Sequence, residues 1–133
     1  MHALLLGATG LVGGHLLDLL ARDDRVSRLT TLGRRPMAEM ADKHVHHVVD
    51  FDRLGAEAEH FAVDAVFCAL GTTIRQAGSE AAFRRVDYDY PAEAARLARR
   101  QGTPQYLLVS SIGANPESRL FYPRLKGELE ETL

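Results

Sequence analysis

Short runs of apolar residues alternate along the chain with longer segments in which apolar residues recur at helical spacing. The apolar runs predict five strands, at Ala3–Leu6, Val26–Leu32, Val45–Val49, Val63–Leu70 and Tyr106–Val109. The fourth run is the most continuously apolar of the five, which is typical of a strand that is buried on both faces.

The helical spacing predicts helices at Leu11–Arg22, at about Ser79–Gln101 and at about Arg119–Leu133. Pro91 inside the second segment indicates either a kink or a second helix that begins there. Strands that alternate with helices predict an α/β fold, a Rossmann-type doubly wound parallel sheet of about five strands in the order 3-2-1-4-5. The segment Pro36–Lys43 is expected to be a loop or a short helix.

Composition narrows the class of protein. The 133 residues fit a single domain, 1–133, with 46% hydrophobic and 26% charged residues, as in ordinary soluble proteins. A net charge of −2 gives no electrostatic case for nucleic-acid binding, and no apolar run is long enough for a membrane span. With one cysteine, Cys68, and no basic leader before the first apolar run, we expect a cytoplasmic location.

Three glycines with the spacing G-x-x-G-x-x-G lie between the first predicted strand and the first predicted helix. Such a turn lets the backbone approach a pyrophosphate, and the helix N-terminus offers free N–H groups to it. The residues expected to bind the cofactor here are Gly7, Thr9, Gly10, Leu11, Val12 and Gly13. The alternative is a plain tight turn with no ligand.

The end of the second predicted strand indicates which dinucleotide binds. NAD-binding proteins usually carry an acidic residue about 20 residues after the glycine turn, whereas this chain has Arg34 and Arg35 there. Two guanidinium groups would pair with a 2′-phosphate, so the pattern favours NADP(H) over NAD(H). The alternative is a solvated pair of charges on a loop.

Asp50 and Phe51 follow the third predicted strand. The carboxylate is placed to accept a hydrogen bond from the adenine amino group, with the phenyl ring beside the base. The alternative is that Asp50 caps a helix at 52–60.

Tyr122 and Lys126 are four residues apart on the last predicted helix and therefore share one face of it. An ammonium group beside a phenol lowers the phenol pKa, so Tyr122 is a candidate proton donor to a carbonyl oxygen. Ser110 and Ser111 end the fifth strand, where either hydroxyl could polarise a substrate carbonyl. Outside this context the Tyr–Lys spacing is more often a surface pair.

Other polar residues are not assigned to a site. His44, His46 and His47 are interpreted as ordinary residues of a strand edge, and no metal site is predicted. Tyr88 and Tyr90 are interpreted as packing residues, and Cys68 is expected to be buried.

Six segments together resemble the short-chain dehydrogenase/reductase superfamily, and more closely its atypical branch of Tat-interacting-protein-like NAD(P)-binding oxidoreductases and their bacterial relatives. These segments are Leu5–Gly13, Leu32–Arg35, Cys68–Thr73, Arg85–Tyr90, Val109–Ala114 and Tyr122–Glu128. The resemblance implies NADP(H) bound at the carboxyl edge of the sheet, with Leu70, Gly71 and Thr72 beside the nicotinamide ribose. It also implies Tyr122 as the acid/base, Lys126 on the ribose hydroxyls, and Ser110 or Ser111 on the substrate.

The family continues well beyond its lysine-containing helix, whereas this chain stops at Leu133. We therefore expect either a fragment or a protein without the C-terminal substrate lobe. The expected function is NADP-dependent hydride transfer to or from an unidentified small carbonyl or alcohol. The alternative is a non-catalytic NADP-binding regulator or sensor. If the chain ends at its fifth strand and last helix, the open sheet edge predicts a homo-oligomer.

Overall fold

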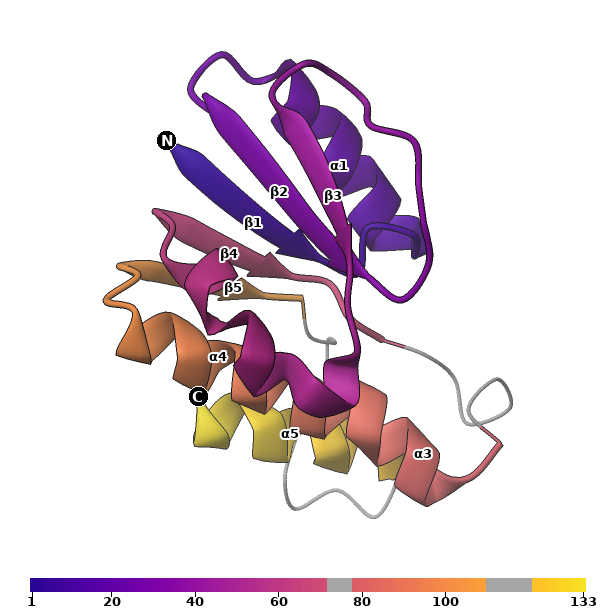
Figure 1. The fold of residues 1–133 in the computed structure, drawn as a ribbon. Helices are drawn as coiled ribbons and strands as arrows, with labels where there is room; N and C mark the ends of the chain where they lie inside the picture. The colour runs from indigo at the N-terminus through magenta and orange to yellow at the C-terminus, as the bar shows by residue number, and fades with distance from the viewer. Residues whose placement is uncertain (72–77, 110–120) are drawn as a thin grey trace.

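The computed structural model describes residues 1–71, 78–109 and 121–133, and of residues 121–126 it describes the backbone alone. Its centre is one parallel five-stranded sheet in the order β3-β2-β1-β4-β5 (Figure 1). The strands are β1 (His2–Leu6), β2 (Arg28–Gly33), β3 (His44–Val48), β4 (Ala65–Cys68) and β5 (Gln105–Leu108). The predicted fold class and strand order are confirmed.

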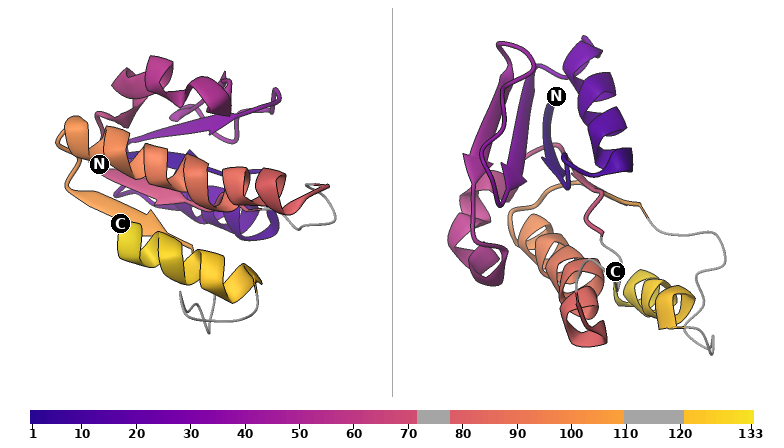
Figure 2. Two further views of the ribbon diagram at one scale, coloured as in Figure 1. Left: turned by 90° about the horizontal axis from the view of Figure 1, so that it is seen from below. Right: turned by 90° about the vertical axis from the view of Figure 1, so that its right-hand side faces the viewer.

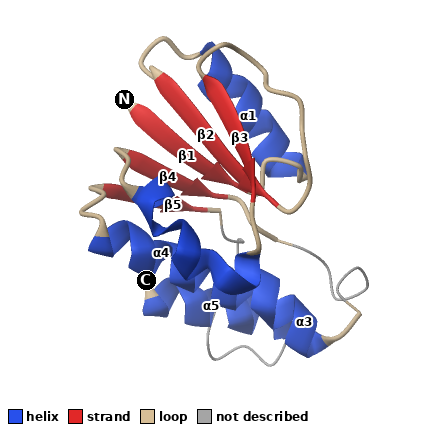
Figure 3. Ribbon diagram, in the orientation of Figure 1, coloured by secondary structure: helices blue, strands red, loops and turns tan. Residues whose placement is uncertain are grey.

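Helices cover both faces of the sheet, as Figures 2 and 3 show. The helix α1 (Leu11–Arg22) lies on one face, whereas the 3₁₀ segment η1 (Phe51–Phe61) and α4 (Tyr90–Arg100) lie on the other. The last helix, α5 (Phe121–Thr132), lies beside α4. This arrangement follows from the connections, since each right-handed crossover places its helix according to the direction in which the chain crosses the sheet.

The central strand β1 is apolar along its whole buried length because it needs partners on both faces. Leu4 and Leu6 pack in a cluster that includes residues of η1 and α4. Ala3 and Leu5 pack in a second cluster that includes Leu17 of α1. All four β1 residues are fully buried, and a buried leucine contributes about 1.5–3 kcal/mol relative to an exposed one.

The register brings the carboxyl ends of the strands to one edge of the sheet. Leu6 at the end of β1 is opposite both Leu32 of β2 and Cys68 of β4. In the same way, Gly33 is opposite Val48 of β3. The loops after β1, β2, β3 and β4 therefore lie along one edge, where open α/β sheets bind their ligands.

Two strands are shorter than predicted. β2 begins at Arg28 because the N–H of Val26 bonds the carbonyl of Asp23 in a turn before the strand. β4 begins at Ala65 because the N–H of Val63 bonds the carbonyl of Phe61 at the end of η1. In both cases an apolar residue is buried in a turn, which hydropathy alone does not distinguish from a strand.

The predicted helix at 79–101 consists of α3 (Glu80–Arg84), a π-helical turn η2 (Arg85–Asp89) and α4. The Ser79 hydroxyl accepts from the N–H of Ala82 and caps the first turn. Pro91 lies in the first turn of α4, the second of the two alternatives, where its missing N–H costs little. Residues 36–43 form a loop rather than a helix.

Candidate functional site

The glycine turn after β1 has the shape that its three glycines predict. Gly7 has a φ of 85°, and a Cβ there would lie 2.4 Å from the carbonyl oxygen of Ala69 at the end of β4. A Cβ on Gly13 would lie 1.7 Å from the carbonyl oxygen of Gly7, so α1 packs directly on the turn. A Cβ on Gly10 would meet its nearest atom at 3.6 Å, and this exposed glycine leaves the outer side of the turn open.

The N-terminus of α1 is uncapped by side chains. Gly10 is the N-cap residue and makes no side-chain bond to the first-turn N–H groups. Leu11 is 82% exposed and Val12 is 47% exposed, and Thr9 is exposed beside them. Free N–H groups, the helix dipole and an open approach fit a pyrophosphate.

Arg34 and Arg35 directly follow β2 and are exposed. Their loop lies at the same edge of the sheet as the glycine turn, because Leu32 is opposite Leu6 in the register. The fold thus brings the two arginines and the turn to the same edge, as the sequence predicts.

The residues after β3 favour the structural alternative. The Asp50 carboxylate accepts a hydrogen bond of 2.9 Å from the N–H of Asp52 and caps η1. Phe51 is 6% exposed and packs against Tyr90 with ring centroids 5.5 Å apart. Little of the Phe51 ring is therefore available to an adenine, and a role for Asp50 with the base stays a prediction.

The phenol of Tyr90 lies among charged side chains near the carboxyl edge of the sheet. Its hydroxyl donates to Asp52 at 2.7 Å, and Arg85 lies 3.9 Å from the same carboxylate. Burial, and then the hydrogen bond to Asp52, raise the pKa of Tyr90 to about 12, against the opposing charges of Arg85 and Arg34. Tyr90 therefore packs against Phe51 and hydrogen-bonds Asp52, which agrees with its interpretation as a packing residue.

At the end of β4, Leu70 is half-buried and Gly71 is exposed. The carboxylate of Asp87, on η2, would lie 3.4 Å from a Cβ on Gly71, although Asp87 itself is only 1% exposed. Sequence reasoning did not place Asp87 against this loop. The contact depends on how η2 packs over the strand end, which has no local signal.

The helix α5 forms where the sequence predicts it, with Tyr122 and Lys126 on it. Its second half is anchored to the preceding helical segments. Arg84 of α3 lies 3.1 Å from Glu128, and the Tyr88 and Thr132 hydroxyls are 2.5 Å apart. Thr72, Ser110, Ser111 and the side chains of Tyr122 and Lys126 lie outside the described residues, so their roles stay predictions.

Comparison with known families identifies the family of the chain. Residues 3–128 match the family model described as the NAD dependent epimerase/dehydratase family. The chain belongs to this epimerase/dehydratase family. The resemblance to the short-chain dehydrogenase/reductase superfamily is thereby confirmed.

Matches to curated relatives cover nearly the whole chain. Protein HTATIP2 of Rattus norvegicus is 41% identical over 130 residues, which are 95% of this chain and 53% of that protein. Protein FMP52, mitochondrial, of Debaryomyces hansenii is 37% identical over 137 residues, covering 100% of this chain and 60% of that protein. The chain thus spans little more than half the length of these relatives.

Solved structures share the fold of this epimerase/dehydratase domain. MoeE5 in complex with UDP-glucose and NAD superposes with a TM-score of 0.80 at 16% identity, over 99% of this chain and 48% of that one. A putative NAD-dependent epimerase/dehydratase from Bacillus halodurans gives a TM-score of 0.78 at 21% identity, over 99% of this chain and 64% of that one. At these identities the likeness shows the fold alone.

The expected cytoplasmic location is not confirmed, because the name of the Debaryomyces relative places that protein in mitochondria. Within 1–71, 78–109 and 121–133, no helix has the length and apolarity needed to cross a bilayer.

The three histidines of β3 differ in their burial and in their partners. β3 is an edge strand, yet His44 is fully buried, which corrects the interpretation as an ordinary strand-edge residue. His44 and His46 both hydrogen-bond Thr31, whereas the His47 ring stacks on His60 with centroids 4.3 Å apart. No group of three or more potential metal ligands occurs among the residues that the structure describes.

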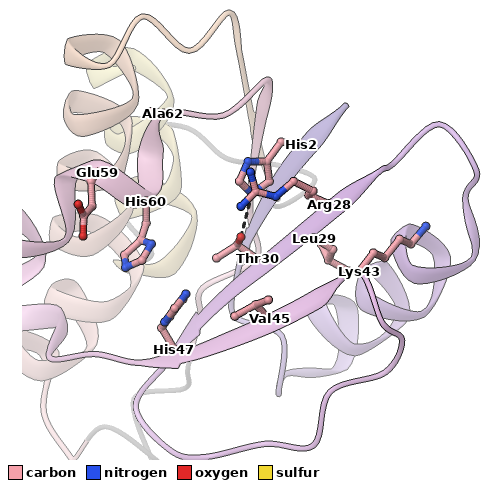
Figure 4. A pocket seen from close by; sticks show the side chains of 10 residues that line it. All are labelled: His2, Arg28, Leu29, Thr30, Lys43, Val45, His47, Glu59, His60 and Ala62. Carbon is pink, nitrogen blue, oxygen red and sulfur yellow. Dashed lines mark hydrogen bonds between the residues drawn. The ribbon is translucent and has the colours of Figure 1, made fainter.

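A cavity of about 360 Å³ lies on the η1 face of the sheet (Figure 4). Its lining includes His2 and Arg28, the first residues of β1 and β2, together with His47 and His60. It therefore lies toward the amino ends of these strands, away from the glycine turn, and it is not the cofactor site.

Proposed function

We propose that this epimerase/dehydratase-family chain is an NADP(H)-dependent oxidoreductase that transfers hydride between the nicotinamide and a small carbonyl or alcohol. The observation that carries the proposal is that one edge of the sheet holds both an uncapped helix N-terminus behind a glycine turn and the exposed Arg34–Arg35 pair. A pyrophosphate fits the first feature and a 2′-phosphate fits the second.

The residues present suit a dinucleotide at this edge. Gly10 leaves the outside of the turn free of side chains, and the exposed Leu11 and Val12 offer apolar surface beside the phosphate site. The similar fold of MoeE5 is described with NAD, which supports a dinucleotide here without choosing between NAD and NADP. The arginine pair is the reason to propose NADP, because each guanidinium can pair with a phosphate dianion.

The chain's own residues would handle the proton. A bound nicotinamide supplies or accepts the hydride. We assign proton transfer to the Tyr122 hydroxyl, with Lys126 lowering its pKa and holding the ribose hydroxyls. Ser110 or Ser111 would hold the substrate oxygen through its hydroxyl. The placement of Tyr122 and Lys126 on α5, which is anchored through Glu128, is compatible with these roles.

The cofactor proposal is tested by titrating the protein with NADPH and with NADH while following nicotinamide fluorescence. The expected result is preferential NADPH binding that weakens at least about 100-fold in the double variant Arg34→Ala/Arg35→Ala, since losing charge-assisted pairs costs about 1.5–3 kcal/mol each. NADH binding should change little. Equal losses for both cofactors would show that the arginines do not recognise the 2′-phosphate.

The acid/base proposal is tested with a panel of aldehydes and ketones and the variant Tyr122→Phe. We expect the variant to bind NADPH normally and to lose turnover by about 100-fold or more, as removal of a general acid does. Unchanged turnover would remove Tyr122 from the mechanism. Intact NADPH binding without oxidation by any carbonyl compound would favour the alternative of a non-catalytic sensor.

A further inference from the structure

The loop between β2 and β3 carries the arginine pair, and side chains of the sheet hold it at two points. The N–H of Met40 lies 2.9 Å from Nδ1 of His44. The carbonyl oxygen of Arg35 lies 2.7 Å from Nε2 of His46. The two rings meet at one hydroxyl, because Thr31 Oγ1 lies 2.9 Å from His44 Nε2 and 2.7 Å from His46 Nδ1.

With both imidazoles neutral, the backbone groups at the two ends dictate the direction of every bond in this chain. The Met40 N–H can only donate, so His44 accepts at Nδ1 and carries its proton on Nε2. His44 therefore donates to Thr31, whose hydroxyl donates in turn to Nδ1 of His46. The remaining proton of His46 is then on Nε2, where the Arg35 carbonyl accepts it. All four bonds are satisfied by one arrangement of protons.

We propose that this relay of Thr31, His44 and His46 is a specificity device that positions Arg34 and Arg35 for the 2′-phosphate of NADP(H). The proposal rests on the proposed function, since it names the residues that hold the phosphate-binding loop. The three residues act through the loop, so they are positioning residues and not ligands of the cofactor.

Packing supports the relay. Thr31 and His44 are fully buried, so loss of one bond leaves a buried polar group without its partner. The His46 ring lies against the end of β2, where a Cβ on Gly33 would be 2.9 Å from Cε1 of the ring. Burial also lowers the pKa of His44, which favours the neutral ring that the relay needs. Met37 offers the Thr31 hydroxyl only a weak sulfur acceptor at 3.8 Å.

The expected consequence is selective for the 2′-phosphate. Two-point pairing of guanidinium with phosphate depends on orientation, and a loop released from the sheet would have to be ordered again on binding. NADH has no group for the pair to recognise. Breaking the relay should therefore change the preference between the two cofactors more than it changes binding of NADH.

The chain offers a matched control on the opposite face of the same strand. Thr30 bonds Nε2 of His2 at 2.8 Å, as the dashed line in Figure 4 shows. Thr31→Val removes the hydroxyl at the centre of the relay, whereas Thr30→Val removes a threonine–histidine bond that does not reach the loop. We expect Thr31→Val to weaken NADPH binding about tenfold and to leave NADH binding within about twofold. Thr30→Val should change neither, and Thr31→Ser, which keeps the hydroxyl, should restore NADPH binding.

A second pair of variants keeps the test decisive if Thr31→Val lowers the melting temperature too far for binding to be measured. His46→Leu removes the bond to Arg35, and the neighbouring change His47→Leu lies on the other face of β3. Hydrogen exchange at the Met40 amide, which bonds His44, reports on how firmly the other end of the loop is held. We expect faster exchange and a lower NADPH/NADH preference in His46→Leu, with both unchanged in His47→Leu.

The outcomes separate the two proposals. If Arg34→Ala/Arg35→Ala leaves the cofactor preference unchanged, the NADP proposal fails and the positioning role fails with it. If the arginine variant lowers the preference and neither Thr31→Val nor His46→Leu does, the relay proposal alone is wrong. An equal loss of NADPH and NADH binding in Thr31→Val, without rescue by Thr31→Ser, also overturns the relay and indicates a purely structural role.

Discussion

The glycine turn permits a test in which two similar substitutions should affect different properties, one the stability of the fold and the other cofactor binding. Gly13→Ala and Gly10→Ala each add one methyl group to the same turn, three residues apart. The Gly13 methyl would point into the packing between α1 and the turn that follows β1, whereas the Gly10 methyl would point toward the open side where we place the pyrophosphate. The first change should affect folding and the second should affect binding.

The magnitudes follow from the spaces available. A Cβ on Gly13 would lie 1.7 Å from the Gly7 carbonyl oxygen, so the backbone must separate by at least about 1.3 Å to reach the 3.0 Å limit of real contacts. Overpacking of this kind costs about 1–3 kcal/mol, and here the obstacle is backbone, which favours the upper end. Such a loss corresponds to a fall in Tm of roughly 10 °C. A Cβ on Gly10 has 3.6 Å of clearance and a φ of −76°, so it meets no steric obstacle. Alanine is a poorer N-cap than glycine by roughly 0.5–1 kcal/mol, but it restricts the unfolded chain by about 0.4–1 kcal/mol, so the net cost is a few tenths of a kcal/mol.

Thermal melting by circular dichroism and NADPH titration, both on each variant, separate the two effects. Gly10→Ala should melt with the wild type and bind NADPH at least about tenfold more weakly, because a methyl group there blocks close approach of a phosphate. Gly13→Ala should have a Tm roughly 10 °C below that of the wild type. If the Gly10 variant binds NADPH normally, the pyrophosphate does not lie at this turn. If the Gly13 variant melts with the wild type, the close packing of α1 on the turn is refuted.

Three further predictions concern stability and titration. Burial holds the pKa of His44 below its usual 6.5, so the unfolded chain takes up the proton first as the pH falls. The free energy of unfolding, measured with urea, should therefore fall as the pH drops below 6.5 and rise with pH across that window. His44→Gln should flatten this slope. Ser79→Ala removes the cap of α3 and should lower the free energy of unfolding by about 1 kcal/mol, measured by urea denaturation, whereas Ser79→Asp should retain most of it. Asp52→Asn removes the charged acceptor of the Tyr90 hydroxyl and should bring the Tyr90 pKa down from about 12 in an ultraviolet titration; an unchanged value would mean that burial alone sets it.

Much of the fold could be predicted because its signals are local. A fully apolar run followed by glycines at fixed spacing predicts a buried strand, a tight turn and a helix, and β1 and α1 form there. Ser79 and Gly102 mark helix ends through a hydroxyl cap and a positive φ of 73°, both properties of single residues. Strand limits were less predictable, since Val26 is buried in a turn and resembles a strand residue in hydropathy.

Some residues of the candidate site could be assigned from the sequence and others could not. Arg34 could be assigned to the edge near the glycine turn because parallel strands end at a common edge. Phe51 could not be assigned from the sequence, because whether its ring faces a ligand or the core depends on how η1 lies on the sheet. The structure places it in the core against Tyr90.

The sequence by itself determined the order of the elements, the position of the glycine turn and the place of the two arginines along the chain. Only the tertiary structure decided which polar groups meet. Thr31 and His46 are opposite each other in the register of β2 and β3, and a slip of one residue would turn the His46 ring to the other face of the sheet, away from Thr31. That pairing depends on side-chain packing between neighbouring strands that are separated along the chain. No local pattern of residues could therefore have predicted it.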